Sequence, residues 1–303
     1  MASAQVNRQF VLTKGEYFSE IQLWPLRKEL DCENWLKNFT NSELPHAVQL
    51  LNSFLYFSNP LLDAMFVAAF QTLSMKIADP RMSIALAREK WREFVDSVIV
   101  TYPTGETPNP TDSGFTYARK ARQLLQIPQE RIVSPQDALA TILSGAKCPI
   151  VFVDDFVGTG HQFATTWQRE VPSLGKVSFK TSGVAPGSCF YCPLFCTEKG
   201  NTTLAGFCPE VILSPVHLLS SRFSALAGDS LIWPPKYQTT AFDFLQQASK
   251  RAGIPDSGGS QPDDWQGFGK LGLTLALGDS VPDATLPIFY WEKNGWKPLV
   301  RRR

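Results

Sequence analysis

The chain has 303 residues, of which 44% are hydrophobic and 12% aromatic, with 29 basic and 28 acidic residues. This composition is typical of a globular protein, and the charge balance excludes a strong overall field for nucleic acid or an anionic membrane. The longest apolar stretch, residues 61–73, is too short to span a bilayer, and the first residues lack the apolar region of a signal peptide. We therefore expect a cytoplasmic protein without membrane contact.

The first part of the chain carries helical patterns. Apolar residues recur at helical spacing within 47–54 and within 62–70, and a further helix is expected at 82–94. Asn59-Pro60 falls between the first two patterns, and Pro60 suits the first turn of a helix. Because these apolar faces need a partner, we interpret residues 1–94 as a helical region packed on the core.

From residue 95 onward, short apolar runs alternate with helical patterns. Strands are expected at 98–100, 132–133, 149–153 and 189–197, and helices at 114–125, 135–143, 162–170 and 216–226, with a loop before the first helix that ends at Asp112. Such alternation predicts an α/β fold with a mostly parallel sheet flanked by helices, over residues 95–230. Residues 231–303 are less regular. Expected strands at 271–277 and 286–291 and a turn at Asn294-Gly295 make them a strand-containing C-terminal extension.

The most informative segment is residues 150–162, which read Ile-Val-Phe-Val-Asp-Asp-Phe-Val-Gly-Thr-Gly-His-Gln. We expect Asp154 and Asp155 to follow a strand that is buried on both faces, at the edge where parallel sheets bind ligands. Two adjacent carboxylates there can accept hydrogen bonds from vicinal sugar hydroxyls or hold a hydrated Mg2+. A helix cap with a surface charge, or a receiver-type acidic pocket, would also place acids at a strand end.

The segment Gly158-Thr159-Gly160 stands directly before an expected helix. Glycines let backbone N–H groups converge on one point, and the helix N-terminus adds positive potential, so the loop can hold a phosphate. His161 and Gln162 continue this loop. Acids that can bind sugar hydroxyls or a metal are thus followed within a few residues by a loop that can bind a phosphate. This combination suits a phosphorylated ribose as the ligand.

Residues 150–162 resemble the phosphoribosyl pyrophosphate motif of type I phosphoribosyltransferases. The resemblance implies that Asp154 and Asp155 are catalytic, contact the ribose hydroxyls and share Mg2+ with the pyrophosphate, while residues 158–162 hold the 5-phosphate. A loop after the first core strand binds pyrophosphate in such enzymes, and by position it is Tyr102-Pro103-Thr104-Gly105 here, where a plain connecting loop is the alternative. Gly158 and Gln162 depart from the family, which usually has Thr or Ser there.

The wider chain resembles the phosphoribosyltransferase-like effectors of bacterial anti-phage defence systems. The segments that carry this likeness, besides residues 154–160, are residues 35–39, 56–58, 286–287 and 296–299. It implies a toxic effector that works with a partner protein, a sensor or an ATPase, and that meets nucleic acid only as a substrate or through this partner. The alternative from another class is a non-catalytic nucleotide-sensing module that keeps a degenerate phosphoribosyl pocket.

Three further groups of residues admit a functional and a structural interpretation. Cys189, Cys192, Cys196 and Cys208 invite a zinc site, but the aromatic residues between them favour a buried strand. Basic side chains at 119, 120 and 122 could neutralise a leaving group or form a solvated helix face. Aromatic residues at 265, 268, 291 and 296 could stack on a nucleobase, although core packing is the simpler interpretation.

Overall fold

The computed structural model describes residues 6–105, 113–185 and 187–302, so most of the expected loop that ends at Asp112 lies outside the described residues. The chain forms two compact units. Unit 1 combines residues 1–62 with residues 220–303, and unit 2 consists of residues 63–219. The ranges expected from the sequence, 1–94, 95–230 and 231–303, divide the chain differently, because unit 1 joins segments that are distant in sequence.

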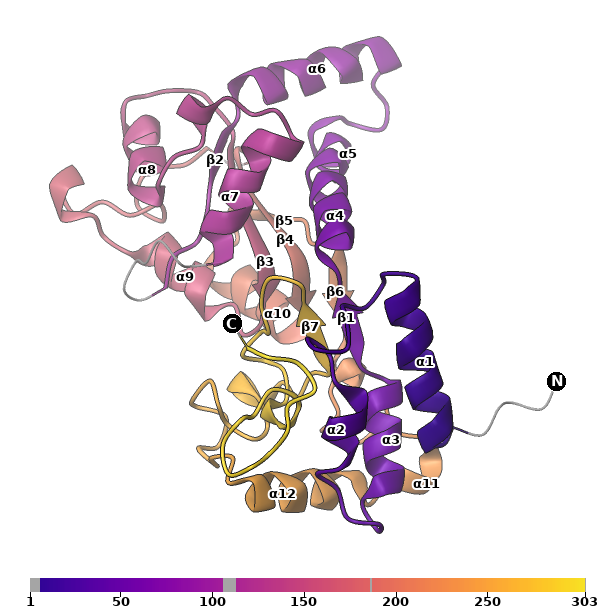
Figure 1. Ribbon diagram of the computed structural model, residues 1–303. Coiled ribbons are helices and arrows are strands. Elements are labelled where there is room, and N and C mark those ends of the chain that lie inside the picture. Colours follow the sequence, from indigo (N-terminus) through magenta and orange to yellow (C-terminus); the bar gives the residue numbers. More distant parts are fainter. Residues whose placement is uncertain (1–5, 106–112, 186, 303) are drawn as a thin grey trace. The chain divides into compact units, whose positions relative to one another are not determined.

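Unit 2 contains a parallel sheet, as the alternation of strands and helices predicts (Figure 1). Its strand order is β2-β3-β4-β5, and β6 pairs with the same edge of β4 as β5 does. Every pairing in this sheet is parallel. The strands are β2 (Ile99–Thr101), β3 (Ile150–Val157), β4 (Cys189–Thr197), β5 (Ile212–Leu213) and β6 (His217–Leu219).

Helices cover both faces of this sheet. On one face, Phe94 of α6 meets Phe190 of β4, with ring centroids 5.5 Å apart. On the other face, Phe163 of α9 packs on Phe152 of β3 at 5.0 Å. The mixed α/β fold with helices flanking a parallel sheet is confirmed. The helices are α4 (Asn59–Thr72), which begins in unit 1, and α5 (Ser74–Ile77), α6 (Ile84–Ser97), α7 (Ser113–Leu124), α8 (Pro135–Leu143), α9 (His161–Gln168) and α10 (Glu198–Phe207), all in unit 2.

The interruption between β5 and β6 has a local cause in β4. Pro193 lies in the middle of this central strand and has no N–H to donate. Its carbonyl accepts from Val216 N at 3.3 Å, so Pro193 faces the edge where β5 has ended and β6 has not begun. The helix expected at 216–226 is therefore absent. Residues His217–Leu219 pair with β4 as β6, and residues Ser221–Phe223 form a 3-10 turn.

Unit 1 is built around aromatic side chains. Trp35 is fully buried and stacks on Phe289 at 5.4 Å, and Phe39 contacts Trp296 edge-on at 5.3 Å. These contacts explain why the N-terminal and C-terminal segments form one unit. The elements are α1 (Arg8–Glu20), α2 (Cys32–Leu36), α3 (Leu44–Asn52), α11 (Pro235–Gln238), α12 (Ala241–Ala252) and the parallel pair β1 (Leu55–Phe57) and β7 (Leu275–Leu277).

Other local expectations have mixed outcomes. The strand at 271–277 is shorter, Leu275–Leu277, and the strand expected at 286–291 is wrong, because Pro287–Phe289 is a 3-10 turn that begins with proline. Residues 132–133 make only a bridge, through Ile132 to Val100. The turn at Asn294-Gly295 is confirmed, with φ of +56° and +74°. Short 3-10 helices also occur at Gln129–Arg131, Pro172–Leu174 and Phe268–Lys270.

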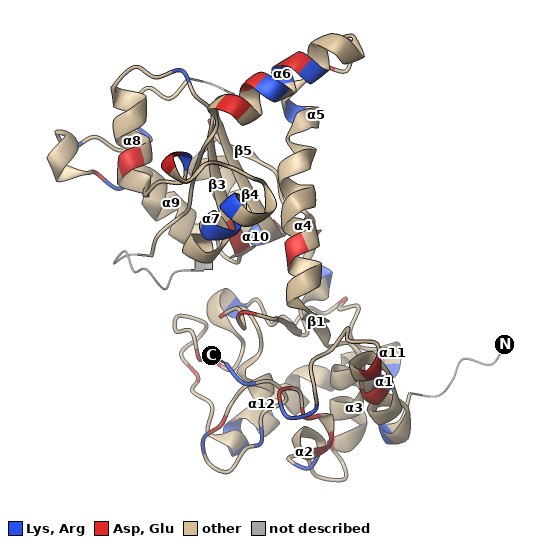
Figure 2. Cartoon of the chain, turned by 45° about the horizontal axis from the view of Figure 1, so that its top comes forward, with Lys and Arg blue, Asp and Glu red and all other residues tan. Residues whose placement is uncertain are grey.

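Charged residues of both signs are interspersed over the surface, as the near-neutral balance indicates (Figure 2). Helix α6 is an example, since Arg88, Lys90 and Arg92 alternate with Glu89 and Glu93. Among the residues that the structure describes, no helix has both the length and the apolar character that crossing a membrane requires.

Candidate functional site

The acid pair lies within strand β3 and not beyond its end. The strand continues to Val157, where the sequence predicts an end at residue 153, and Asp154 pairs in register with Pro193 of β4. Asp154 is 1% exposed and Asp155 is 5% exposed. Two ionisable side chains are thus buried side by side, which is unfavourable unless polar partners meet them.

Asp154 has such partners. The Tyr191 hydroxyl donates to Asp154 Oδ2 at 2.8 Å, and the backbone N–H of Asp155 donates to Oδ1 at 2.9 Å. Tyr191 is itself fixed, because its ring stacks on Phe163 of α9 with centroids 4.1 Å apart. The position of Asp154 is therefore set by strand β4 and helix α9 together.

The electrostatics of the pair favour a proton or another cation. Burial raises the pKa of Asp154 well above its ordinary 3.8, and the negative charge of Asp155 raises this pKa further. The Tyr191 hydroxyl opposes the shift, since its hydrogen bond stabilises the ionised form. The two carboxyl groups also share a side-chain hydrogen bond, so they are close despite the alternation of side chains along a strand.

The turn after β3 is held by helix α10. Thr197, the N-cap of α10, donates its hydroxyl proton to the Gly158 carbonyl at 2.6 Å and accepts from Gly200 N at 3.0 Å. Gly160 has φ of +79°, and a Cβ there would lie 2.9 Å from the Gly200 carbonyl oxygen. Glycine is thus required at position 160 both by backbone conformation and by close packing.

The N-terminus of α9 is uncapped. Gly160 is its N-cap and supplies no side-chain cap. Among the described residues, none accepts a hydrogen bond from the backbone N–H of Gly160, His161 or Gln162. Both His161 and Gln162 are exposed, while Thr159 is 8% exposed. Uncapped amides at a helix N-terminus can bind an anion such as a phosphate.

The expected pyrophosphate loop lies against the same helix. Tyr102 to Gly105 follow β2, whose last residue, Thr101, pairs with Phe152 in the middle of β3, before β3 ends at Val157. Thr104 N donates to the Thr166 hydroxyl at 3.0 Å, and Arg169 donates to the Thr104 hydroxyl at 2.6 Å. Tyr102 contacts Phe115 of α7 at 5.4 Å, and Pro103 is buried. The loop after β2 therefore contacts the second half of α9 and its C-cap, whereas the turn at Gly158–Gly160 lies at the beginning of the same helix.

The acid pair suits Mg2+ by its chemistry. Carboxylate oxygens are the ligands that this ion prefers, and a cation would relieve the repulsion between Asp154 and Asp155. No group of three or more His, Cys, Asp or Glu side chains that could hold a metal occurs within residues 6–105, 113–185 and 187–302. A site with two carboxylates fits the common arrangement in which substrate phosphates complete the coordination of Mg2+.

The basic residues of α7, the cysteines and the tryptophans make contacts that stabilise the fold. Lys120 pairs with Asp63 of α4 at 2.8 Å, and Arg122 donates to Gln129 at the surface. The cysteines at 189, 192, 196 and 208 are buried, and burial raises the pKa of each thiol. The tryptophans at 265, 291 and 296 belong to the core of unit 1.

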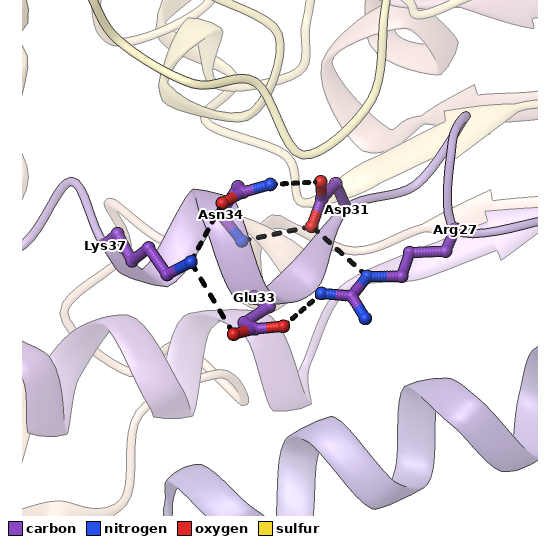
Figure 3. Close-up of polar contacts among 5 residues, drawn as sticks. All are labelled: Arg27, Asp31, Glu33, Asn34 and Lys37. Carbon is purple, nitrogen blue, oxygen red and sulfur yellow. Dashed lines mark hydrogen bonds and ion pairs between the residues drawn. The ribbon is translucent and has the colours of Figure 1, made fainter.

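A second acidic cluster, in unit 1, shows the contrast with the buried pair (Figure 3). Glu33 pairs with Arg27 and lies 3.6 Å from Lys37, while Asp31 caps α2 by accepting from Asn34 N at 3.0 Å. Each acid there has a cationic or capping partner at the surface, where such pairs contribute little to stability. This cluster is explained by the local helix and needs no ligand.

The contacts that organise the site include residues that the sequence pattern does not single out. Tyr191, Thr166 and Arg169 act over long sequence separations, and each looks ordinary in its own segment. Thr197 has a readable signal, because a Thr that ends a buried strand and precedes Glu198 is typical of an N-cap.

Comparison with protein-family models gives one family. The PRTase-CE model matches residues 32–302 and so spans both units. This family is phosphoribosyltransferase-like, which supports a transferase-type function at a coarse level. No curated protein matches the chain. No solved structure matches it either.

Proposed function

Because the chain belongs to the PRTase-CE family, we propose that it binds phosphoribosyl pyrophosphate or a related nucleotide with Mg2+ and transfers or cleaves at ribose C1. The observation that carries the proposal is the sequence of features along β3. A buried acid pair, Asp154 and Asp155, is followed by a glycine turn and by the open amides of α9.

We assign each part of the donor and the metal ion to particular residues of the chain. Asp155 and Asp154 accept hydrogen bonds from the ribose hydroxyls, and Tyr191 keeps Asp154 oriented. The amides of residues 160–162 hold the 5-phosphate, and the loop from Tyr102 to Gly105 receives the pyrophosphate. Mg2+ held by Asp154 and Asp155 would stabilise the negative charge that develops on the leaving group.

The biological role that we propose is that of a cytoplasmic toxic effector in a bacterial defence system, restrained or directed by a partner protein. It rests on the resemblance of the wider chain to such effectors. The acceptor would be a base, a nucleotide or a nucleic acid.

The second candidate function is a nucleotide-sensing module that binds the ligand but does not catalyse a reaction. Gly158 and Gln162 stand where the family usually has hydroxyl residues, so Thr159 has the one hydroxyl side chain of residues 158–162 and the phosphate would depend more on backbone amides. Exposure of Gln162 leaves its amide able to donate. A nucleotide-sensing module would bind the same ligand and leave it intact.

Calorimetric titration tests the donor assignment. Phosphoribosyl pyrophosphate with Mg2+ should bind the wild type and should bind the variant Asp154→Asn/Asp155→Asn at least about 100-fold more weakly, because the charge that holds the metal and the sugar is removed. The surface variant Asp31→Asn/Glu33→Gln removes two acids from the cluster of Figure 3 and serves as the matched control. A folded wild type that does not bind would overturn the assignment.

Turnover separates the two functions. Release of pyrophosphate from the bound donor, in the presence of bases, nucleotides or nucleic acid, is expected of an effector enzyme. Binding with an unchanged donor recovered after long incubation would favour the sensing module.

A further inference from the structure

A groove in unit 1 lies beside α1 and takes no part in the site at β3. It has a volume of about 380 Å3 and is lined by α1 and by the segment that leads into α2. Two of its apolar residues, Leu30 and Cys32, are buried, and Leu12 is partly buried against the core of unit 1. A Cβ at Gly15 would lie 3.1 Å from Cys32 Sγ, so the start of α2 packs closely on α1. The groove therefore has an apolar lining that the fold holds in place.

One apolar side chain of this groove is left in solvent. Leu26, which also lines it, is 65% exposed. An exposed leucine is ordinary when it is isolated, but Leu26 continues the apolar lining of a groove. The lining residues of α1 extend from Leu12 to Glu20, which corresponds to a helical rise of about 12 Å. This length suits about two turns of a docked helix, whose anchors recur every three or four residues.

The acids that α1 contributes to the groove have no cation beside them. Glu16 and Glu20 are exposed, and within residues 6–105, 113–185 and 187–302 neither forms an ion pair. Like charges four residues apart repel, and Glu20 ends α1, where the helix dipole disfavours a negative charge. Glu33, which also lines the groove, is by contrast paired with Arg27 (Figure 3). Glu16 and Glu20 thus do not stabilise their own helix, and their charges are available to a cationic ligand.

We propose that this groove binds an amphipathic helix of a partner protein, with apolar side chains in the groove and with Lys or Arg beside Glu16 and Glu20. A basic helix supplies the opposite charges, whereas the two acids would repel an acidic helix. A helix without cations would cover the acids with apolar surface and leave them unpaired, which costs free energy. Every residue that lines the groove belongs to unit 1, so the inference is independent of the donor assigned to unit 2.

Selection from a displayed peptide library tests the chemistry of the occupant. The peptides have about 16 residues, enough to form a helix, with Leu at every third or fourth position and with Lys, Arg, Glu, Asp, Gln or Ala at the others. The full-length wild-type protein is the bait, and clones that also bind the variant Glu16→Gln/Glu20→Gln are removed. We expect the retained peptides to be enriched in Lys and Arg. A selection that retains no peptide, or retains peptides rich in Glu and Asp, would overturn the proposal.

Fluorescence anisotropy with one selected peptide locates its contacts on the protein. We expect Glu16→Gln/Glu20→Gln to weaken binding about tenfold, because two opposite charges are lost. Leu26→Ser removes the exposed apolar side chain of the groove, and should weaken binding about fivefold. All three positions are exposed, so the variants should fold as the wild type does, which circular dichroism checks.

Matched variants control for charge and for apolar area. Glu89→Gln/Glu93→Gln removes two exposed acids four residues apart on α6 of unit 2. Ile21→Ser removes an apolar side chain that is 51% exposed and does not line the groove. Both should leave the affinity of the peptide within about twofold of the wild type. Losses as large as those from the groove variants would overturn the location of the binding site.

A second copy of the chain is the alternative occupant of the groove. Sedimentation velocity of the wild type and of Leu26→Ser distinguishes it, because self-association through the groove depends on this leucine. We expect the two proteins to sediment as the same species. A wild-type dimer that Leu26→Ser converts to a monomer would assign the groove to self-association and overturn the proposal.

Discussion

Three core tryptophans of unit 1 differ from the acid pair of unit 2 in how their buried polar groups are satisfied. In unit 1, the indole N–H groups of Trp35 and Trp296 donate to the Ile288 carbonyl at 2.8 and 3.0 Å, and that of Trp291 donates to the Ala252 carbonyl at 2.9 Å. In unit 2, Asp154 and Asp155 bury like charges next to each other. The indole N–H groups have protein acceptors, so these side chains contribute to the packing of the core. The two buried carboxyl groups repel each other and lie near amides without acceptors, which indicates a binding site where a ligand would supply the missing partners.

The largest expected loss of stability comes from a substitution in the tryptophan core of unit 1. Trp35→Ala removes a fully buried ring that stacks on Phe289, and should lower the free energy of unfolding by about 3–5 kcal/mol, measured by urea denaturation followed by circular dichroism. Tyr17→Ala, at a side chain that is 55% exposed, should change it by less than about 0.5 kcal/mol. Similar losses from the two variants would contradict the assignment of Trp35 to the core.

A smaller effect is expected at the glycine turn. Gly160→Ala combines an unfavourable φ with a Cβ 2.9 Å from the Gly200 carbonyl oxygen, and should destabilise the protein by about 2–3 kcal/mol and abolish ligand binding. Gly145 has φ of +85° with open space around it, so Gly145→Ala isolates the conformational cost of about 1 kcal/mol. If Gly145→Ala is equally destabilising, close packing on α10 does not matter.

The smallest expected change in the free energy of unfolding is a gain in stability, at Asp154. The folded, metal-free protein holds the Asp154 proton more tightly than the unfolded chain, so its stability should fall as the pH rises from 3.8 through the raised pKa. Asp154→Asn removes the charge, while its Oδ1 can still accept from Asp155 N and its Nδ2 can donate to the Tyr191 oxygen, so the variant should be more stable than the wild type at neutral pH by about 1 kcal/mol. Urea denaturation between pH 4 and pH 8 measures this. A wild-type stability that rises with pH over that range relative to the variant would contradict the buried acid pair.

Features encoded by adjacent residues could be predicted from the sequence. Ser134 and Pro135 mark the start of α8, and the Ser134 hydroxyl does accept from Asp137 N at 3.1 Å. The apolar run before Asp154 predicts a buried strand, and Gly158 to Gly160 predict the turn into α9. These signals need no knowledge of what packs around them.

The remainder depends on contacts between distant segments. Nothing near Thr166 indicates that it meets Thr104, and the stack of Trp35 on Phe289 joins opposite ends of the chain. The error at residues 216–226 has the same origin, because His217–Leu219 pair with the distant strand β4. The apolar run predicts an end of β3 at residue 153, whereas the strand continues to Val157 and Tyr191 provides Asp154 with a buried partner.

A crystal structure of the protein with phosphoribosyl pyrophosphate and Mg2+ would test the central claim most directly. The account predicts the 5-phosphate on the amides of residues 160–162, the ribose hydroxyls and the metal at Asp154 and Asp155, and the pyrophosphate against Tyr102 to Gly105. Ligand density elsewhere, with no contact to Asp154, Asp155 or the first turn of α9, would contradict it.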